Sequence, residues 1–197
     1  KIVEQKDCTA TEREVREINT SIYCASQSFL HESLSHLQSD NAQGEFYFTD
    51  TVAWGIRAGK RVAAACLKDA TAVTGANSRA ELSALEIARR EAINWGHMER
   101  GATFEDPRAA YIDEDVTLGE DVFIGANVRL QGATSISAGT VLEGDTKVID
   151  STIAEGALLR LGCYVESSRI GKGCKIGPYA HLRPGTVLHE DVHIGNF

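Results

Sequence analysis

The chain has 197 residues and a mass of 21.3 kDa, which is enough for one large domain or two small ones. Its net charge of −8 and its scattered basic residues argue against a nucleic-acid partner. Hydrophobic residues make up 43% of the chain, which is ordinary for a folded protein. The sequence contains no run of 18 consecutive apolar residues, so no membrane-spanning helix is predicted.

The start of the sequence and its cysteines limit the cellular context. The sequence begins at Lys1, and its only methionine is Met98, so we expect an internal piece of a longer protein. No apolar core of a secretion signal is visible in the first 30 residues. The cysteines are Cys8, Cys24, Cys66, Cys163 and Cys174. Their odd number and the absence of a CxxC pair favour buried free thiols in a reducing cytoplasm.

Up to about residue 105 the pattern alternates between strand-like and helical segments. Residues 16–25 are rich in β-branched side chains and residues 61–67 are a short apolar run, so both are predicted to be strands. Residues 26–37 and 50–57 carry apolar side chains at helical spacing, and Gly59 ends the second helix. This alternation predicts part of an α/β sheet.

A longer helix is predicted to follow these segments. Ser78 and Glu81 have the spacing of a capping box, in which a serine accepts from a backbone N–H three residues later. The helix that they open has an apolar stripe, predicted to be its buried face. The stripe comprises Leu82, Leu85, Ala88, Ala92 and Trp95.

From residue 110 onward a six-residue repeat takes over. Large apolar anchors occupy positions 112, 118, 124, 130, 136, 142 and 148, then 153, 159 and 165, then 170, 176, 182, 188 and 194. The phase slips by one residue after Val148 and again after Val165. The residue two before each anchor is always small or β-branched, and glycine often follows the anchor.

A period of six predicts a solenoid whose triangular coil has three short strands. Both the anchor and the small residue before it point into the prism, and the slips fall at corners. Three hexads form one coil, so the fifteen hexads predict about five coils. Coincidental apolar spacing in an ordinary all-β domain is the alternative, which fifteen paired matches disfavour.

At this point the chain resembles a family of bifunctional bacterial enzymes, the N-acetylglucosamine-1-phosphate uridyltransferase/glucosamine-1-phosphate acetyltransferases. The matching segments are 2–7, 17–20, 41–50 (NAQGEFYFTD), 75–79, 181–186 (HLRPGT) and 192–197 (VHIGNF), in the family's order. The resemblance implies the C-terminal part of a Rossmann-like nucleotidyltransferase domain with a linker helix at 1–104. The N-terminal part of a left-handed parallel β-helix acetyltransferase domain would follow at 105–197.

The resemblance also implies an activity. Members acetylate glucosamine 1-phosphate with acetyl-CoA, then transfer uridylyl from UTP with Mg²⁺ to make UDP-N-acetylglucosamine for peptidoglycan and lipopolysaccharide, and so for the cell wall. They are cytoplasmic homotrimers that assemble through the β-helix and use neither nucleic acid nor membrane as a partner.

Three residues of the first domain match family positions that bind substrate. Glu4 resembles the carboxylate that holds the hydroxyls of N-acetylglucosamine, and a carboxylate can accept from two hydroxyls at once. Asn19 resembles an asparagine that binds the same sugar. Asn77 resembles the ligand of Mg²⁺ beside the nucleotide phosphates. The structural alternatives are a strand-end glutamate, an edge-strand asparagine and a helix N-terminal residue. By the same resemblance, Tyr47, Thr49 and Asp50 lie in a segment that borders the sugar site, and a purely structural role is their alternative.

In the β-helix Arg183 resembles the arginine that binds the sugar phosphate, for which a forked guanidinium is suited. A solvated corner charge is its alternative. Because Leu182 is an anchor, Arg183 is predicted to point outward. His181, His189 and His193 do not match the family's catalytic histidine, and their spacing does not follow the coil, so zinc is disfavoured.

The sequence lacks the family's glycine-rich phosphate loop, and the acetyl-transfer histidine is expected beyond Phe197. The chain alone is therefore predicted to be inactive in both reactions. Two other interpretations stay open: another sugar-phosphate nucleotidyltransferase with a β-helix tail, and a trimerising β-helix scaffold without catalysis.

Overall fold

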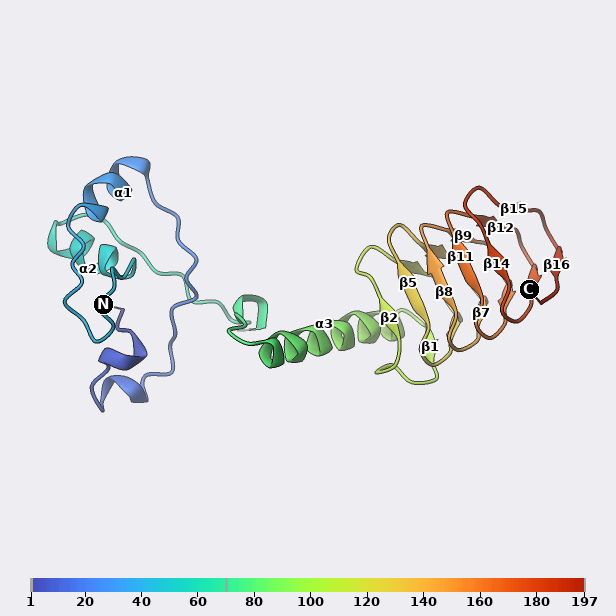
Figure 1. Ribbon diagram of the computed structural model, residues 1–197, viewed down its shortest axis with the longest axis horizontal. Helices are drawn as coiled ribbons and strands as arrows, with labels where there is room; N and C mark the ends of the chain where they lie inside the picture. The colour runs from blue at the N-terminus through green and yellow to red at the C-terminus, as the bar shows by residue number, and fades with distance from the viewer. Residues whose placement is uncertain (1, 70, 197) are drawn as a thin grey trace. The chain divides into compact units, whose positions relative to one another are not determined.

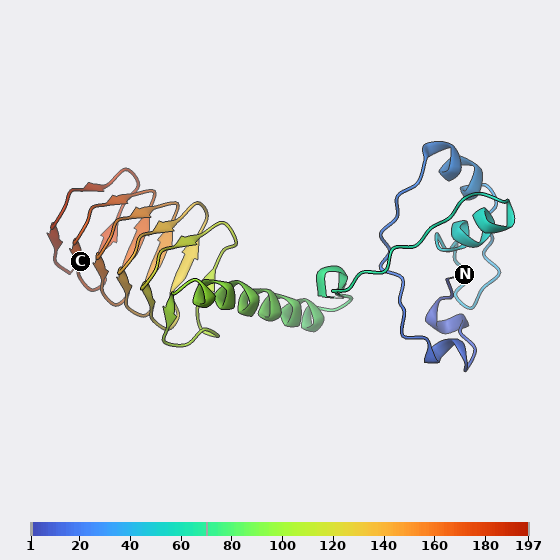
Figure 2. The ribbon, with the colours of Figure 1, turned by 180° about the vertical axis from the view of Figure 1, so that it is seen from behind.

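The computed structural model describes residues 2–69 and 71–196 and divides into two compact units, one up to Gly75 and one from Ala76 onward. Lys1, Ala70 and Phe197 lie outside the described residues. Lys1 is the first residue of the first predicted domain, and Phe197 is the last residue of the second predicted domain and of the VHIGNF match. Figures 1 and 2 present the chain from opposite sides.

The first unit is built from short helices. Its elements are the 3₁₀ turns η1 (Gln5–Asp7), η2 (Glu12–Glu14) and η3 (Thr71–Val73), and the helices α1 (Gln27–Leu34) and α2 (Asp50–Arg57). Both α-helices lie where helical spacing predicted them, and α1 packs against α2. Gly59 follows α2 with φ +70°, a conformation that glycine adopts without steric cost.

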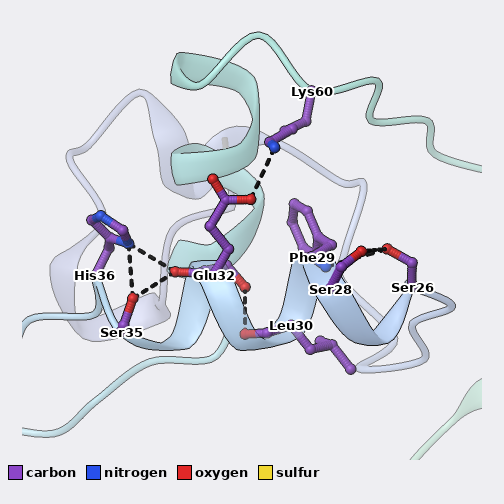
Figure 3. A network of polar contacts seen from close by, with 9 residues as sticks. Ser26, Ser28, Phe29, Leu30, Glu32, Ser35, His36 and Lys60 are labelled. Atoms are coloured by element: carbon purple, nitrogen blue, oxygen red, sulfur yellow. Dashed lines mark hydrogen bonds and ion pairs between the residues drawn. The ribbon is translucent and has the colours of Figure 1, made fainter.

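Helix α1 is held at both ends by side chains (Figure 3). Its N-cap Ser26 accepts a hydrogen bond from the backbone N–H of Phe29 at 3.2 Å. In its last turn Glu32 forms a 2.9 Å ion pair with Lys60, which comes just after α2. The imidazole of His36 stacks on Trp54 of α2 with ring centroids 5.2 Å apart. These contacts join the two helices although the unit has little apolar core.

The strands predicted at residues 16–25 and 61–67 are wrong. The first unit contains no strand within residues 2–69 and 71–75, and both segments are solvent-exposed. Ile18 and Ile22 are 75% and 71% exposed. A strand needs a neighbouring backbone to satisfy its N–H and C=O groups. In this unit no described segment pairs with either of them, so propensity alone does not make a strand.

Helix α3 (Arg79–Glu99) opens the second unit and confirms the capping box. The Ser78 hydroxyl accepts from the backbone N–H of Glu81 at 3.2 Å, and the Glu81 carboxylate accepts from the N–H of Asn77 at 2.6 Å. The predicted apolar stripe is not the buried face, because Leu82 and Trp95 are 51% and 63% exposed.

The fully buried residues of α3 are polar, and beside them the partly buried Ile93 packs against the hydrophobic core of the solenoid. Asn94 and His97 are the buried residues of α3. The helix packs against the strand β2 (Tyr111–Ile112) of the solenoid. The Asn94 side-chain amide donates to the carbonyls of Pro107 at 2.7 Å and Ala110 at 3.0 Å. The helix therefore closes the first coil by satisfying backbone carbonyls, which hydrophobic periodicity cannot reveal.

The rest of the second unit is a parallel β-solenoid (Figure 1). Its strands are β1 (Thr103–Phe104), β2 (Tyr111–Ile112), β3 (Thr117–Leu118), β4 (Phe123–Ile124), β5 (Arg129–Gln131), β6 (Ser135–Ile136), β7 (Val141–Leu142), β8 (Lys147–Ile149), β9 (Thr152–Ile153), β10 (Leu158–Leu159), β11 (Tyr164–Glu166), β12 (Arg169–Ile170), β13 (Lys175–Ile176), β14 (His181–Leu182), β15 (Val187–Leu188) and β16 (His193–Ile194).

Every third strand is a hydrogen-bonded neighbour, which gives three sheets. We name them sheet A (β1-β4-β7-β10-β13-β16), sheet B (β2-β5-β8-β11-β14) and sheet C (β3-β6-β9-β12-β15). The five strands in sheets B and C make about five coils, so the predicted coil number is confirmed. One additional strand, β1, precedes the first hexad that the repeat marked.

The hexad anchors form the core of the solenoid. Ile124, Leu142 and Leu159 are completely buried on sheet A, and the anchors of sheets B and C are buried as well, except Leu118 and Leu188, which are partly buried. The small residues before the anchors are buried with them, except Thr186 and Val192, which are partly buried. Where these are polar they bond to backbone, as when the Thr140 hydroxyl donates to the carbonyl of Ala154 at 3.1 Å.

The one-residue slips lie at the corner between sheets B and C. Asp150 and Ser167 occupy this corner with φ of +45° and +43°, in the same column as Gly132 and Gly185. The strands on either side keep their register, with Val148 beside Val165 and Ile153 beside Ile170. A shorter corner thus leaves the inward direction of the anchors unchanged, as predicted.

Candidate functional site

A cavity of about 520 Å³ lies in the first unit. Its lining comprises Glu4, Ser21, Tyr23, Gln43, Glu45, Phe46, Tyr47, Phe48 and Thr49. The wall mixes aromatic rings with a few carboxylates, amides and hydroxyls, which is typical of a site for a small polar ligand. Two segments matched by the family resemblance, 2–7 and 41–50, meet in it.

Glu4 lies on this wall just before η1. Its Oε1 accepts a hydrogen bond from the hydroxyl of buried Thr49 at 3.3 Å. Thr49 immediately precedes α2, so the helix start holds the hydroxyl that orients the carboxylate. A carboxylate has further acceptor capacity for ligand hydroxyls. Asp50 is the first residue of α2 and does not line the cavity.

Tyr47 links the two segments of the wall. Its hydroxyl donates to the Asp7 carboxylate at 3.2 Å and accepts from the Gln43 amide at 2.9 Å. Asp7 also accepts from the backbone N–H of Ala42 at 2.9 Å. Partial burial raises the pKa of Tyr47, the Gln43 bond opposes this, and the Asp7 bond adds to it. The phenol is therefore a neutral donor at physiological pH.

Asn19 does not line the cavity, but it contacts a residue that does. Its amide donates to the hydroxyl of Tyr23 at 2.7 Å, and the Tyr23 ring meets Phe48 edge to face at 5.0 Å. Sequence reasoning placed Tyr23 only within a predicted strand and did not single out Gln43 or Phe48. Proximity in sequence to Asn19 and to Tyr47 is the signal that could have identified them.

Asn77 belongs to the second unit. It is exposed and directly precedes the N-cap of α3, where its N–H donates to Glu81. Mg²⁺ prefers oxygen ligands that include carboxylates. Within residues 2–69 and 71–196, no three histidine, cysteine, aspartate or glutamate side chains are grouped to hold a metal. One amide therefore does not form a Mg²⁺ site, and the described residues do not fit the ion by themselves.

Arg183 lies on the outside of the solenoid, directly after β14. Its side chain is exposed while Leu182 is 6% exposed, so the predicted outward direction is confirmed. The Arg183 carbonyl accepts from the hydroxyls of Ser168 at 3.1 Å and Thr186 at 2.7 Å. These bonds hold the backbone at the corner, so the guanidinium projects from a rigid position.

The cysteines divide between the two units. Cys163 and Cys174 are buried in the solenoid, and burial raises the pKa of the Cys163 thiol. Cys24 and Cys66 are exposed, and Cys8 is half-buried, so the expectation of buried thiols is wrong for the first unit. The reason for this error is the one that also explains the missing strands, because both exposed cysteines lie in segments that were predicted to be β-strands.

The cavity segments and the solenoid occur together in known proteins. The chain is 45% identical over all 197 residues to the bifunctional protein GlmU of Streptococcus suis and 43% identical to that of Streptococcus thermophilus. The chain belongs to the GlmU family. It spans 43% of the length of each of these curated relatives. No helix in the described residues is long and apolar enough to cross a membrane.

Two other comparisons each cover about half of the chain. A family described as GMPPB C-terminal domain matches residues 101–196. Crystal structures of a perosamine N-acetyltransferase, PerB, from Caulobacter crescentus in complex with CoA and GDP-perosamine cover 55% of this chain and 60% of theirs. The identities are 18% and 19%, with TM-scores of 0.22 and 0.23, for the parent protein and for a histidine-to-alanine mutant of it.

Proposed function

We propose that the chain is part of an enzyme that makes UDP-N-acetylglucosamine. Acetyl transfer from acetyl-CoA to glucosamine 1-phosphate would be followed by uridylyl transfer from UTP to N-acetylglucosamine 1-phosphate. The observation that carries this proposal is the 42–45% identity with GlmU relatives along the whole chain. The functional boundary would lie at 104/105, with α3 as a linker helix.

In this proposal the first unit holds the acetylated sugar. The Glu4 carboxylate would accept from the sugar hydroxyls, while Thr49 keeps it oriented. Asn19 would act with Tyr23, to which it is hydrogen-bonded. Tyr47 would stay protonated and donate within the wall. Asn77 would be at most one neutral ligand of Mg²⁺, and we derive no step through the ion.

The solenoid would serve the acetyl transfer. Arg183 would bind the phosphate of glucosamine 1-phosphate with its forked guanidinium. Acetyl-CoA, when bound, supplies the acetyl group. Cytoplasmic location, a role in the cell wall and homotrimers formed through the solenoid complete the proposal, in keeping with the family resemblance.

The binding roles can be tested by calorimetry on the 197-residue chain. Glu4→Gln should weaken N-acetylglucosamine 1-phosphate binding at least tenfold, whereas the exposed control Glu17→Gln should not. Arg183→Gln should weaken glucosamine 1-phosphate binding, and Arg160→Gln is its matched control, because Arg160 also follows an anchor and is exposed. Equal effects of variant and control would contradict the assigned roles.

The activity can be tested with UTP and with acetyl-CoA in coupled assays. We expect no turnover, because the 197 residues hold neither a glycine-rich phosphate loop nor a histidine at the family's catalytic position. Robust turnover would contradict the predicted inactivity. Another sugar-phosphate nucleotidyltransferase is the second candidate, favoured by the match of residues 101–196 to the GMPPB C-terminal domain. Preference for a nucleotide other than UTP in the longer protein would support it.

A further inference from the structure

The outer face of sheet B carries one column of aromatic and basic side chains. The strand register aligns Tyr111 with Arg129, Arg129 with Lys147, Lys147 with Tyr164, and Tyr164 with His181. Each precedes an anchor and therefore points away from the core. Figure 1 shows the labelled strands of this sheet side by side along the solenoid, next to the end of α3.

Aromatic rings hold the cations of this column in place. The guanidinium carbon of Arg129 lies 4.6 Å from the centroid of Tyr111, and that of Arg90, from α3, lies 4.4 Å from the same centroid. The ammonium of Lys147 lies 5.7 Å from the ring of Tyr164. Such contacts fix the position of a cation without neutralising it.

Arg129 and Lys147 are like charges aligned on adjacent strands, which lie about 4.8 Å apart in a sheet. Like charges in register destabilise a sheet. Within the described residues, 2–69 and 71–196, none of Arg90, Arg129 and Lys147 has an ion-pair partner. The Nε of Arg90 is in addition buried without a hydrogen-bond acceptor.

The acidic groups that flank this column bond to other residues or are aligned with a residue that carries no charge. The Asp113 carboxylate accepts from the N–H of Gly132 at 3.0 Å, and Asp145 accepts from Asn127 at 3.1 Å. Glu114 pairs with Arg89, the neighbour of Arg90 in α3. Glu166 is aligned with Ile149 and not with a cation. Within residues 2–69 and 71–196, no carboxylate forms an ion pair with Arg90, Arg129 or Lys147, although the chain has a net charge of −8.

We propose that Arg90, Arg129 and Lys147 form a binding site for a phosphate-bearing anion on the outer face of sheet B. Two guanidinium groups and an ammonium supply donors suited to phosphate oxygens. The bound anion would relieve the repulsion between Arg129 and Lys147. The site is separate from the cavity of the first unit, and its residues are not those assigned to the sugar phosphate.

Calorimetric titration of the whole 197-residue chain with inorganic pyrophosphate, at constant ionic strength in chloride, tests this proposal. Saturable binding is expected, weakened at least tenfold by Arg129→Gln and by Lys147→Gln. Arg169→Gln is the matched control, because Arg169 also precedes an anchor and is exposed, but is aligned with Thr152 and Val187. Arg183→Gln should leave intact the part of the pyrophosphate binding that Arg129→Gln and Lys147→Gln weaken, which separates this site from the proposed sugar-phosphate site.

Thermal unfolding gives a second measurement. Lys147→Gln should lose the rise in Tm that pyrophosphate causes in the parent chain. Absence of saturable binding, or equal losses in the Arg169→Gln control, would overturn the proposal. It would also be overturned if Arg129→Gln changed the sedimentation coefficient and left pyrophosphate binding intact, since the column would then be a contact between copies of the chain.

Discussion

The aromatic ring of Tyr179 lies directly over Gly162, which occupies the same corner of the solenoid one coil earlier. A Cβ atom at residue 162 would come within 2.5 Å of Cδ1 of this ring. Both residues have positive φ, +70° for Gly162 and +58° for Tyr179. The corner thus combines a left-handed backbone with a close approach that glycine alone allows.

Gly162→Ala should lower the free energy of unfolding by about 2–4 kcal/mol, because it adds left-handed strain to a clash with a ring. Gly139→Ala is the matched control: Gly139 has φ +64°, but a Cβ atom added there would meet nothing within 4 Å. It should cost only about 1–2 kcal/mol. Urea denaturation of both variants measures the difference, and equal losses would contradict the role of Tyr179.

Within these 197 residues, truncation of an anchor should cost less toward the last coil of the solenoid. Leu159 is completely buried on sheet A, so Leu159→Ala should destabilise by about 2–5 kcal/mol. Leu188 is only partly buried in the last complete coil, so Leu188→Ala should cost less than half as much. Chemical denaturation followed by circular dichroism measures the loss of unfolding free energy in both variants. Equal losses would contradict the expectation that the cost of truncation follows the burial of the anchor.

His97 makes stability depend on pH. It is 4% exposed on the inner side of α3, and burial, aided by the positive charge of Arg100, lowers its pKa below the usual value of 6.5. The unfolded chain therefore binds more protons than the folded chain just below pH 6.5, and stability should fall as the pH drops through this value toward the folded pKa. Above pH 6.5 this contribution is fully present.

Urea unfolding between pH 5 and pH 8 measures this effect. His97→Gln should flatten the pH dependence of the unfolding free energy in this window, although it also lowers stability throughout. His189→Gln is the control, since His189 is exposed. A slope that is unchanged in the His97 variant would rule out this origin.

Ser78 should stabilise the first turn of α3. Ser78→Ala removes the acceptor for the Glu81 N–H and should cost about 0.5–2 kcal/mol. Ser83→Ala, at an exposed position inside the same helix, should not destabilise, because alanine has the higher helix propensity. Hydrogen exchange of the amides in the first turn of α3 distinguishes the two variants. Equal protection would contradict a capping role for Ser78.

Much of the candidate site was predictable from short sequence motifs. Segments 2–7 and 41–50 were assigned to a common sugar site, and the structure brings Glu4, Tyr47 and Thr49 into one cavity. Tyr23 was not predicted to line it, because its position depends on a loop that passes Ser21 with φ +58°. The roles of Glu4, Asn19, Asn77 and Arg183 in binding stay predictions.

The solenoid was determined by the sequence itself. Each hexad places its anchor and its small residue inward, and each coil repeats the same requirement, so the pattern of residues 110–194 defines the strands, the sheets and even the shortened corners at Asp150 and Ser167. The helices α1, α2 and α3 were also predictable from the local sequence, because their apolar spacing and their caps involve residues only three or four positions apart.

Only the tertiary structure decided that segments 16–25 and 61–67 form no strands and which face of α3 is buried. A strand exists only if another backbone pairs with it, and a helix buries whichever face meets a neighbour. Asn94 is buried where its amide donates to two carbonyls of the first coil, and His97 is buried on the same side of α3, whereas the apolar stripe with Leu82 and Trp95 remains exposed. Propensity and periodicity report what a segment can do, but contacts between distant residues select among these possibilities.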